Sequence, residues 1–182
     1  METFTPPRDL VENDRYPDER RAALAALDLT AVDEPIVDVV EAFAPLPHVF
    51  TLQCCFGHFL TAPEQDEHSL APIPDGHNGP VRYRIAYVAF GIEDSGRGRA
   101  FLDRLSRIPA IAPAYVQFGS AEWFWAQWLN SYTLQVEPAA HEYKDQAVLT
   151  VAEALRAQRV RARFFDELRR VLAEEHRRGA AR

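Results

Sequence analysis

The chain has few cysteines and no long apolar run, and each absence excludes a class of protein. Its 182 residues contain two cysteines, Cys54 and Cys55, which are adjacent. A disulfide between neighbours is strained and two thiols cannot staple a domain of this size, so we expect both to be reduced. The longest apolar stretches, such as Ile85 to Phe90, fall far short of the ~20 residues that cross a bilayer. A disulfide scaffold and a membrane span are therefore excluded.

Sequence signatures of cofactor binding are missing as well. The chain has no GxGxxG fingerprint, P-loop, serine elbow or internal repeat. No metal is assigned from the sequence, because zinc needs three or four ligands and no CxxC or HxxxH pair supplies them. The segment Met1 to Pro7 has neither the basic region nor the apolar region of a secretory signal, so we expect a cytoplasmic protein. The cofactor stays unassigned.

Charge is unevenly placed along the chain. The net charge is −7, yet residues 153–182 hold nine arginines against five acidic residues, which leaves the remainder more acidic than the whole. An acidic body disfavours broad affinity for nucleic acid, since that affinity depends on phosphate neutralisation. The arginines are typical of a solvated helix face paired with glutamates at helical spacing.

The pattern of the chain predicts a single α+β domain: a mixed sheet of four to five strands, helices packed on it and a long C-terminal helix. Hydrophobic residues make up 47% of the chain, an ordinary globular value. We expect an extended N-terminal arm over 1–17 and the domain over 18–178. Within it, the proline-rich segment 61–80 is predicted to be a loop insertion, and 143–178 to be helical with a break near Arg159.

Individual elements follow from apolar spacing. Asp33 as N-cap, Pro35 in the first turn and apolar residues at i, i+3, i+4 and i+7 predict a helix from Asp33 to Phe43. Strands are predicted over 48–55, 81–92, 115–118 and 130–136. Residues 81–105 and 115–128 each form a strand–loop–helix unit.

The most unusual local feature is Cys54-Cys55-Phe56-Gly57-His58, at the end of one predicted strand. Neighbours on a strand point to opposite faces, so one cysteine shares a side with His58, and we expect Cys55. A thiol and an imidazole across a glycine turn form a catalytic pair or half of a zinc site. The alternative is a buried structural cysteine beside a hydrogen-bonded histidine.

The segment Phe50–His58, preceded by the Asp33–Phe43 helix, resembles the signature of the tRNA wybutosine-synthesising methyltransferase family, Phe-Thr-Thr-Ser-Ser-Cys-Ser-Gly-Arg. The matching positions are Phe50, Thr51, Cys55 and Gly57, and the departures are Leu52, Gln53, Cys54, Phe56 and His58. The resemblance implies an RNA-modifying enzyme that uses S-adenosylmethionine. The chain also resembles bacterial domains of unknown function with Cys-x-Gly-His followed by Tyr-Val-x-Phe, here Tyr87–Phe90.

Two helix starts are further candidates for ligand binding. Arg97 and Arg99 open a helix after Ser95 as N-cap, and Ser120 precedes the next helix, so either start could hold a phosphate or carboxylate. With Gly57, these residues are the predicted ligand-binding set. All three tryptophans lie in the second of these helices, at 123, 125 and 128. Such a cluster is typical of a core or of an interface with a second copy of the chain.

Three functional hypotheses follow. The first is a small-ligand-binding or enzymatic domain with a pocket near Cys55 and His58, where these two residues would be catalytic. The second is a non-enzymatic module that pairs with itself, as a homodimer, or with another protein through the aromatic and arginine-rich helices. The third, from the resemblance, is an RNA-modifying methyltransferase.

Overall fold

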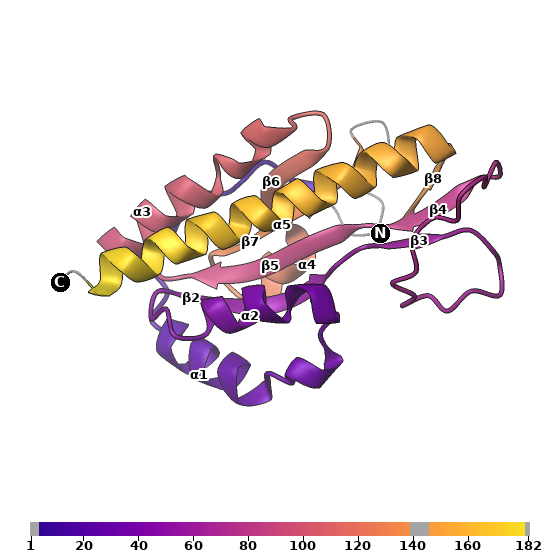
Figure 1. Ribbon diagram of the computed structural model, residues 1–182. Helices are drawn as coiled ribbons and strands as arrows, with labels where there is room; N and C mark the ends of the chain where they lie inside the picture. Colours follow the sequence, from indigo (N-terminus) through magenta and orange to yellow (C-terminus); the bar gives the residue numbers. More distant parts are fainter. Residues whose placement is uncertain (1–3, 139–145, 181–182) are drawn as a thin grey trace.

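The computed structural model describes residues 4–138 and 146–180, and its elements are arranged as in Figure 1. The helices are α1 (Tyr16–Ala26), α2 (Val37–Phe43), α3 (Gly96–Leu105), α4 (Glu122–Gln127) and α5 (Val151–Ala180), with 3-10 turns at Leu29–Ala31, Glu34–Ile36 and Ile108–Ile111. The strands are β1 (Phe4–Thr5), β2 (Val49–Cys55), β3 (His58–Leu60), β4 (Val81–Arg84), β5 (Ala86–Ile92), β6 (Val116–Ala121), β7 (Ser131–Val136) and β8 (Gln146–Leu149).

The strands form two sheets, one in the order β1-β6-β7-β5-β2 and one in the order β3-β4-β8. The α+β class and the long C-terminal helix are confirmed. The mixed character expected of the sheet is wrong, because every pairing among the described strands is antiparallel. The unit β5–α3–β6 does bring two strands into the same direction. However, β7 lies between them and pairs antiparallel with both.

Helices cover one face of the large sheet, and the main core lies between that face and the helices. In Figure 1, α5 crosses in front of the sheet while α4 lies behind it. The four apolar positions that follow the helical period in 33–43 are buried, as expected: Ile36, Val39, Val40 and Phe43. Ile36, Val39 and Phe43 pack with residues of β5 and β7 and with the second half of α5. The i, i+3, i+4 pattern was therefore a sound guide to this layer.

One passage of the chain between the two sheets divides a strand that the sequence predicts as continuous. Residues 81–92 form β4 in the small sheet and β5 in the large one, with Ile85 between them. The β2–β3 connection crosses beside it, because Cys55 pairs with Tyr87 and His58 pairs with Arg84. The sequence shows no break at Ile85, since the apolar pattern runs through it.

A buried tyrosine ties the two sheets together near this crossing. The Tyr83 hydroxyl of β4 donates to the Val136 carbonyl at 2.8 Å and accepts from the Ala86 N–H at 3.0 Å. Its ring stacks on Phe59 at a centroid distance of 4.6 Å in the small core. The crossing is therefore fixed by hydrogen bonds that use the whole capacity of this hydroxyl.

The C-terminal helix begins later than predicted. Tyr143 lies outside the described residues, and 146–149 form β8, which pairs with the edge of β4. Ala147 and Leu149 of β8 are buried while their neighbours are exposed, an alternation that is typical of a strand. From Val151 the helix is continuous to Ala180, so the break expected near Arg159 is absent. No helix in the described ranges combines the length and apolar character needed to cross a bilayer.

The N-terminal segment is extended and bound to the large sheet. β1 pairs with β6, and the Val11 backbone exchanges two hydrogen bonds with the Asn130 side chain. The predicted arm therefore runs along this sheet as far as α1, which begins at Tyr16. Residues 61–80 contain neither helix nor strand, as expected, and they place Ile73 in the small core and Ser69 beside the site described next.

Candidate functional site

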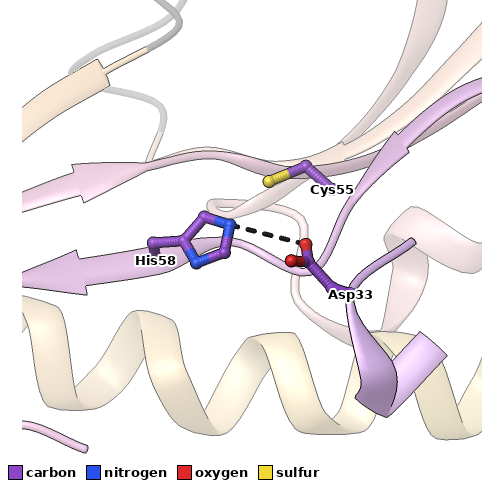
Figure 2. A group of neighbouring side chains, drawn as sticks. All are labelled: Asp33, Cys55 and His58. Atoms are coloured by element: carbon purple, nitrogen blue, oxygen red, sulfur yellow. Dashed lines mark ion pairs between the residues drawn. The ribbon is translucent and has the colours of Figure 1, made fainter. Parts of the chain in front are cut away.

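Three ionisable side chains from three separate segments meet at the crossing between the sheets. Asp33 precedes the 3-10 turn before α2, Cys55 ends β2 and His58 begins β3. One ligand atom from each lies within 4.8 Å of the other two. Figure 2 shows the three side chains directed toward a common point. Cys55 and His58 thus lie on one side, the arrangement on which the sequence hypothesis depended.

Gly57 makes this convergence possible. Its φ is +89°, a region that residues with a side chain rarely adopt. A Cβ at this position would lie 2.8 Å from the Ala86 Cβ and 2.9 Å from the Ala86 nitrogen, where the second strand crosses. The Gly57 N–H also donates to the Cys55 Sγ at 3.4 Å. The turn therefore positions the thiol and the imidazole and places a hydrogen-bond donor on the sulfur.

Asp33 has a different role from the helix cap that the sequence predicts. Its side chain makes no capping hydrogen bond, and the Phe56 N–H donates to Oδ2 at 2.7 Å instead. A capping Asp33 carboxylate would accept a hydrogen bond from the backbone N–H at the position that Pro35 occupies, and proline has no N–H. The carboxylate is therefore available to the β2–β3 turn and lies at the site.

His58 is buried, with 1% of its surface exposed, and its two ring nitrogens face different partners. Nδ1 lies 3.2 Å from the Ser69 carbonyl oxygen, and since a carbonyl only accepts, Nδ1 carries a proton. Nε2 lies 3.4 Å from Asp33 Oδ2. Interactions with the Asp33 carboxylate and the Cys55 thiol raise the pKa of His58 to about 10. Burial acts to raise the pKa of Asp33, but the His58 and Phe56 hydrogen bonds outweigh it and hold the pKa below its ordinary value.

This geometry differs from that of a nucleophile–histidine–carboxylate triad. In a triad the nucleophile and the carboxylate lie at opposite nitrogens of the imidazole. Here Asp33 lies at Nε2, and Figure 2 shows the Cys55 sulfur on the same side of the ring, while Nδ1 is occupied by a backbone carbonyl. The three groups therefore converge as a set of ligand atoms, one oxygen, one sulfur and one nitrogen.

A cavity of about 450 Å³ opens onto the three side chains. It lies on the face of the large sheet opposite α5, where Thr133 and Gln135 of β7 point, and Phe124 of α4 forms another part of its wall. The remaining lining residues are Ala31, Gln53, Cys54, His68, Arg84, Ile85, Tyr87, Ala121, Glu137 and Gln146. The sequence carries a signal for this polar wall, because polar and apolar residues alternate along 131–136.

The wall contributed by β7 is polar and buried. Gln135 Nε2 donates to Glu137 Oε2 at 2.9 Å, and the Glu137 residue has no exposed surface. The Thr133 hydroxyl is buried without a hydrogen-bond partner among the described residues. An unsatisfied buried hydroxyl costs about 1–3 kcal/mol, so this wall is suited to a molecule that supplies the missing contact.

Cys54 and Arg161 flank the site without joining the ligand set. Cys54 packs against the main core, and burial raises the pKa of its thiol to about 11. Arg161 of α5 donates to the Gly57 carbonyl at 2.5 Å, and its guanidinium lies 3.8 Å from the Phe56 ring centroid. Burial lowers the pKa of Arg161. The arginine thus holds the turn from the helix side.

The other predicted ligand-binding residues lie away from the cavity. Ser95 is the N-cap of α3 as expected, but Arg97 lies 3.7 Å from Glu175 and Arg99 forms an ion pair with Asp94. Ser120 belongs to β6 rather than to a helix start, and it accepts from the Arg8 N–H. Of the predicted set, the structure brings together Cys55, Gly57 and His58. Sequence reasoning missed Asp33, Thr133 and Gln135 as members of the site: alternation along 131–136 indicates a polar face but not which segments it lies beside.

Comparison with known proteins yields a likeness of fold. No family model matches the chain, and no curated protein matches it. The solved structure of the PH1069 protein from Pyrococcus horikoshii is similar, with a TM-score of 0.53 and 10% sequence identity over 89% of this chain and 96% of that one. At this identity the similarity concerns the arrangement of helices and strands alone.

Proposed function

We propose that this protein is a small-ligand-binding domain, enzymatic in character, whose ligand occupies the cavity beside Asp33, Cys55 and His58. The observation that carries the proposal is this cavity, on which Cys55 and His58 of one turn converge with Asp33 from a distant segment. Its volume of about 450 Å³ lies within the ~300–1,000 Å³ range of small-molecule sites. Ionisable groups gathered in a cleft are typical of functional sites.

The chemistry of the wall favours a polar ligand with a flat apolar part. Gln53, Thr133 and Gln135 offer amides and a hydroxyl, which fix orientation through hydrogen bonds. Phe124 and Tyr87 offer aromatic surface against which a planar group can pack. A metabolite of moderate size that combines the two fits both kinds of surface.

The proposal is tested by native mass spectrometry of the full chain after incubation with a low-molecular-weight metabolite extract. We expect an adduct that survives buffer exchange. Gln53→Trp, which places a large side chain in the cavity wall, should abolish it, whereas Gln127→Trp on exposed α4 surface should leave it unchanged. Bare polypeptide mass in the wild type, or equal adducts in both variants, would contradict the proposal.

S-adenosylmethionine is the first defined probe, because the Phe50–His58 resemblance implies it. A ligand at 100 times its Kd stabilises a folded protein by about 2.7 kcal/mol. For a chain of this size this corresponds to a rise in Tm of roughly 5–10 °C. We expect such a rise with the wild type and its loss in Gln53→Trp. An unchanged Tm would remove the RNA-modifying methyltransferase hypothesis and leave the cavity open to other ligands.

A second candidate function is self-association through α4. Trp123 of this helix is 53% exposed, an unusual amount for tryptophan, and its ring contacts those of Phe124 and Trp128. Trp125 instead packs inside the chain, against Tyr132 and under the Arg8 guanidinium. Sedimentation should therefore show a homodimer that Trp123→Ala dissociates. A wild-type monomer at high concentration would exclude this function.

A further inference from the structure

We infer that Asp33, Cys55 and His58 form a binding site for one transition-metal ion of the zinc class, with a fourth coordination position open to the cavity. This goes beyond the ligand proposal, because either one can fail while the other stands. The donor atoms are a carboxylate oxygen, a thiol sulfur and an imidazole nitrogen, all of which zinc accepts. Thiolate and imidazole ligands favour zinc-class ions over Mg²⁺ and Ca²⁺.

The spacing of the donor atoms fits tetrahedral coordination. Two nitrogen or oxygen ligands ~2.0–2.1 Å from zinc lie about 3.3 Å apart at the tetrahedral angle. His58 Nε2 and Asp33 Oδ2 are 3.4 Å apart. The corresponding sulfur–nitrogen edge is about 3.6 Å, and no separation within the set exceeds 4.8 Å, so the sulfur needs to approach by about 1 Å at most.

Each of the three metal-binding side chains is already oriented by a hydrogen bond with the backbone. The Ser69 carbonyl accepts from His58 Nδ1, which directs Nε2 toward the other two donors. A histidine that binds a metal usually donates its other N–H in this way. The Phe56 N–H holds the Asp33 carboxylate and the Gly57 N–H points at the Cys55 sulfur. Hydrogen bonds of this kind orient metal ligands.

A second observation points to a ligand at this place. Nε2 of His58 is buried, and its 3.4 Å ion pair with Asp33 Oδ2 does not have the geometry of an ordinary hydrogen bond. A buried polar atom without a well-formed hydrogen bond is costly, and a metal ion would supply a bond in its place. With a carboxylate and a thiolate, a divalent ion would leave the site neutral, which limits the cost of burying its charge.

The open position gives the site a chemical role. Three protein ligands and one exchangeable position are the arrangement of catalytic zinc, where the fourth ligand is water or substrate. All three ligands line the cavity, so a molecule bound there would lie beside the ion. A bound ion can polarise a carbonyl or phosphoryl oxygen, or lower the pKa of a coordinated water.

The test uses the chelator-treated full chain, kept reduced, titrated with Co²⁺ and then with Zn²⁺. We expect one Co²⁺ per chain, with the near-ultraviolet sulfur-to-cobalt charge-transfer absorption of a thiolate ligand, and its loss when Zn²⁺ displaces the cobalt. Cys55→Ser should abolish this absorption. Asp33→Asn should weaken zinc binding by more than ~100-fold, beyond the ~10–100-fold typical of losing a residue that only orients a ligand.

Cys54→Ala is the matched control, because Cys54 is the adjacent thiol and packs against the main core. It should retain the absorption and the stoichiometry. Circular dichroism verifies that each variant folds. If Cys55→Ser fails to fold, Asp33→Asn still tests the site. The inference is overturned if the wild type binds no Co²⁺, if the absorption follows Cys54 instead of Cys55, or if zinc affinity is unchanged in Asp33→Asn.

Discussion

Replacing Gly57 with alanine tests the central structural claim, that a residue without a side chain is required where the two strand connections cross. The change has two costs. A positive φ costs a residue with a Cβ about 1–2 kcal/mol. The new Cβ would also lie 2.8 Å from the Ala86 Cβ and 2.9 Å from its nitrogen, and forcing atoms into a packed region costs roughly 1–3 kcal/mol.

The chain contains a glycine that separates these two costs. Gly76 also has a positive φ, of +77°, but a Cβ there would have no heavy atom within 4 Å. Gly76→Ala should therefore lower the free energy of unfolding by the cost of the positive φ alone, about 1 kcal/mol. Gly57→Ala should lower it by about 3 kcal/mol, because the steric cost is added. In thermal unfolding the two correspond to a fall in Tm of roughly 2–4 °C and 6–12 °C.

The assay is urea unfolding of the wild type and both variants, followed by circular dichroism, with thermal unfolding as a second measurement. The slope of the free energy of unfolding against urea should be the same in all three, so that the midpoints report stability. If Gly57→Ala is no less stable than Gly76→Ala, contact with Ala86 is not what demands glycine, and our account of the crossing is wrong.

Three further predictions concern the core and its buried charges. Burial lowers the pKa of His48, so the unfolded chain takes up a proton that the folded one resists. The stability that His48 contributes above about pH 6.5 should be lost as the pH drops below it, whereas His58, with its raised pKa, acts in the opposite direction. Between about pH 7.5 and 5.5 the urea midpoint of His48→Gln should therefore fall less, or rise more, than that of the wild type. An equal difference in both proteins would refute this. Glu175→Gln should lower the free energy of unfolding by about 3 kcal/mol, because it leaves the largely buried Arg104 without its carboxylate. Glu174→Gln breaks an exposed pair with Arg170 and should lower it by less than ~0.5 kcal/mol. Similar urea midpoints for the two variants would count against this prediction. Leu168→Ala, at a fully buried position of α5, should lower the free energy of unfolding by about 2–5 kcal/mol. Leu155 is 39% exposed, and its replacement by alanine should lower it by less than ~1 kcal/mol. If thermal unfolding ranks the two variants the other way, we have misassigned the buried face of the helix.

Much of the fold follows from local patterns, because they reflect which residues a helix or strand must bury. Ile36, Val39 and Phe43 mark the buried side of the helical segment 34–43, and Gly57 marks the turn after β2. The alternation of 146–149 is equally visible in the sequence, yet the helix predicted over 143–178 includes it. Four residues of alternation are a weak signal beside thirty residues of helix, and β8 is stabilised by its pairing with β4.

The sequence by itself determined that Cys55 and His58 share one side of a turn, because alternation along a strand and a single glycine fix that relation locally. Only the tertiary structure decided that Asp33 completes the set, since its carboxylate leaves the helix start and crosses to a turn 23 positions away. It also decided that 81–92 divides at Ile85 and that a polar cavity adjoins the site. These features arise from contacts between segments far apart in the chain, and the spacing of residues within one segment carries no record of them.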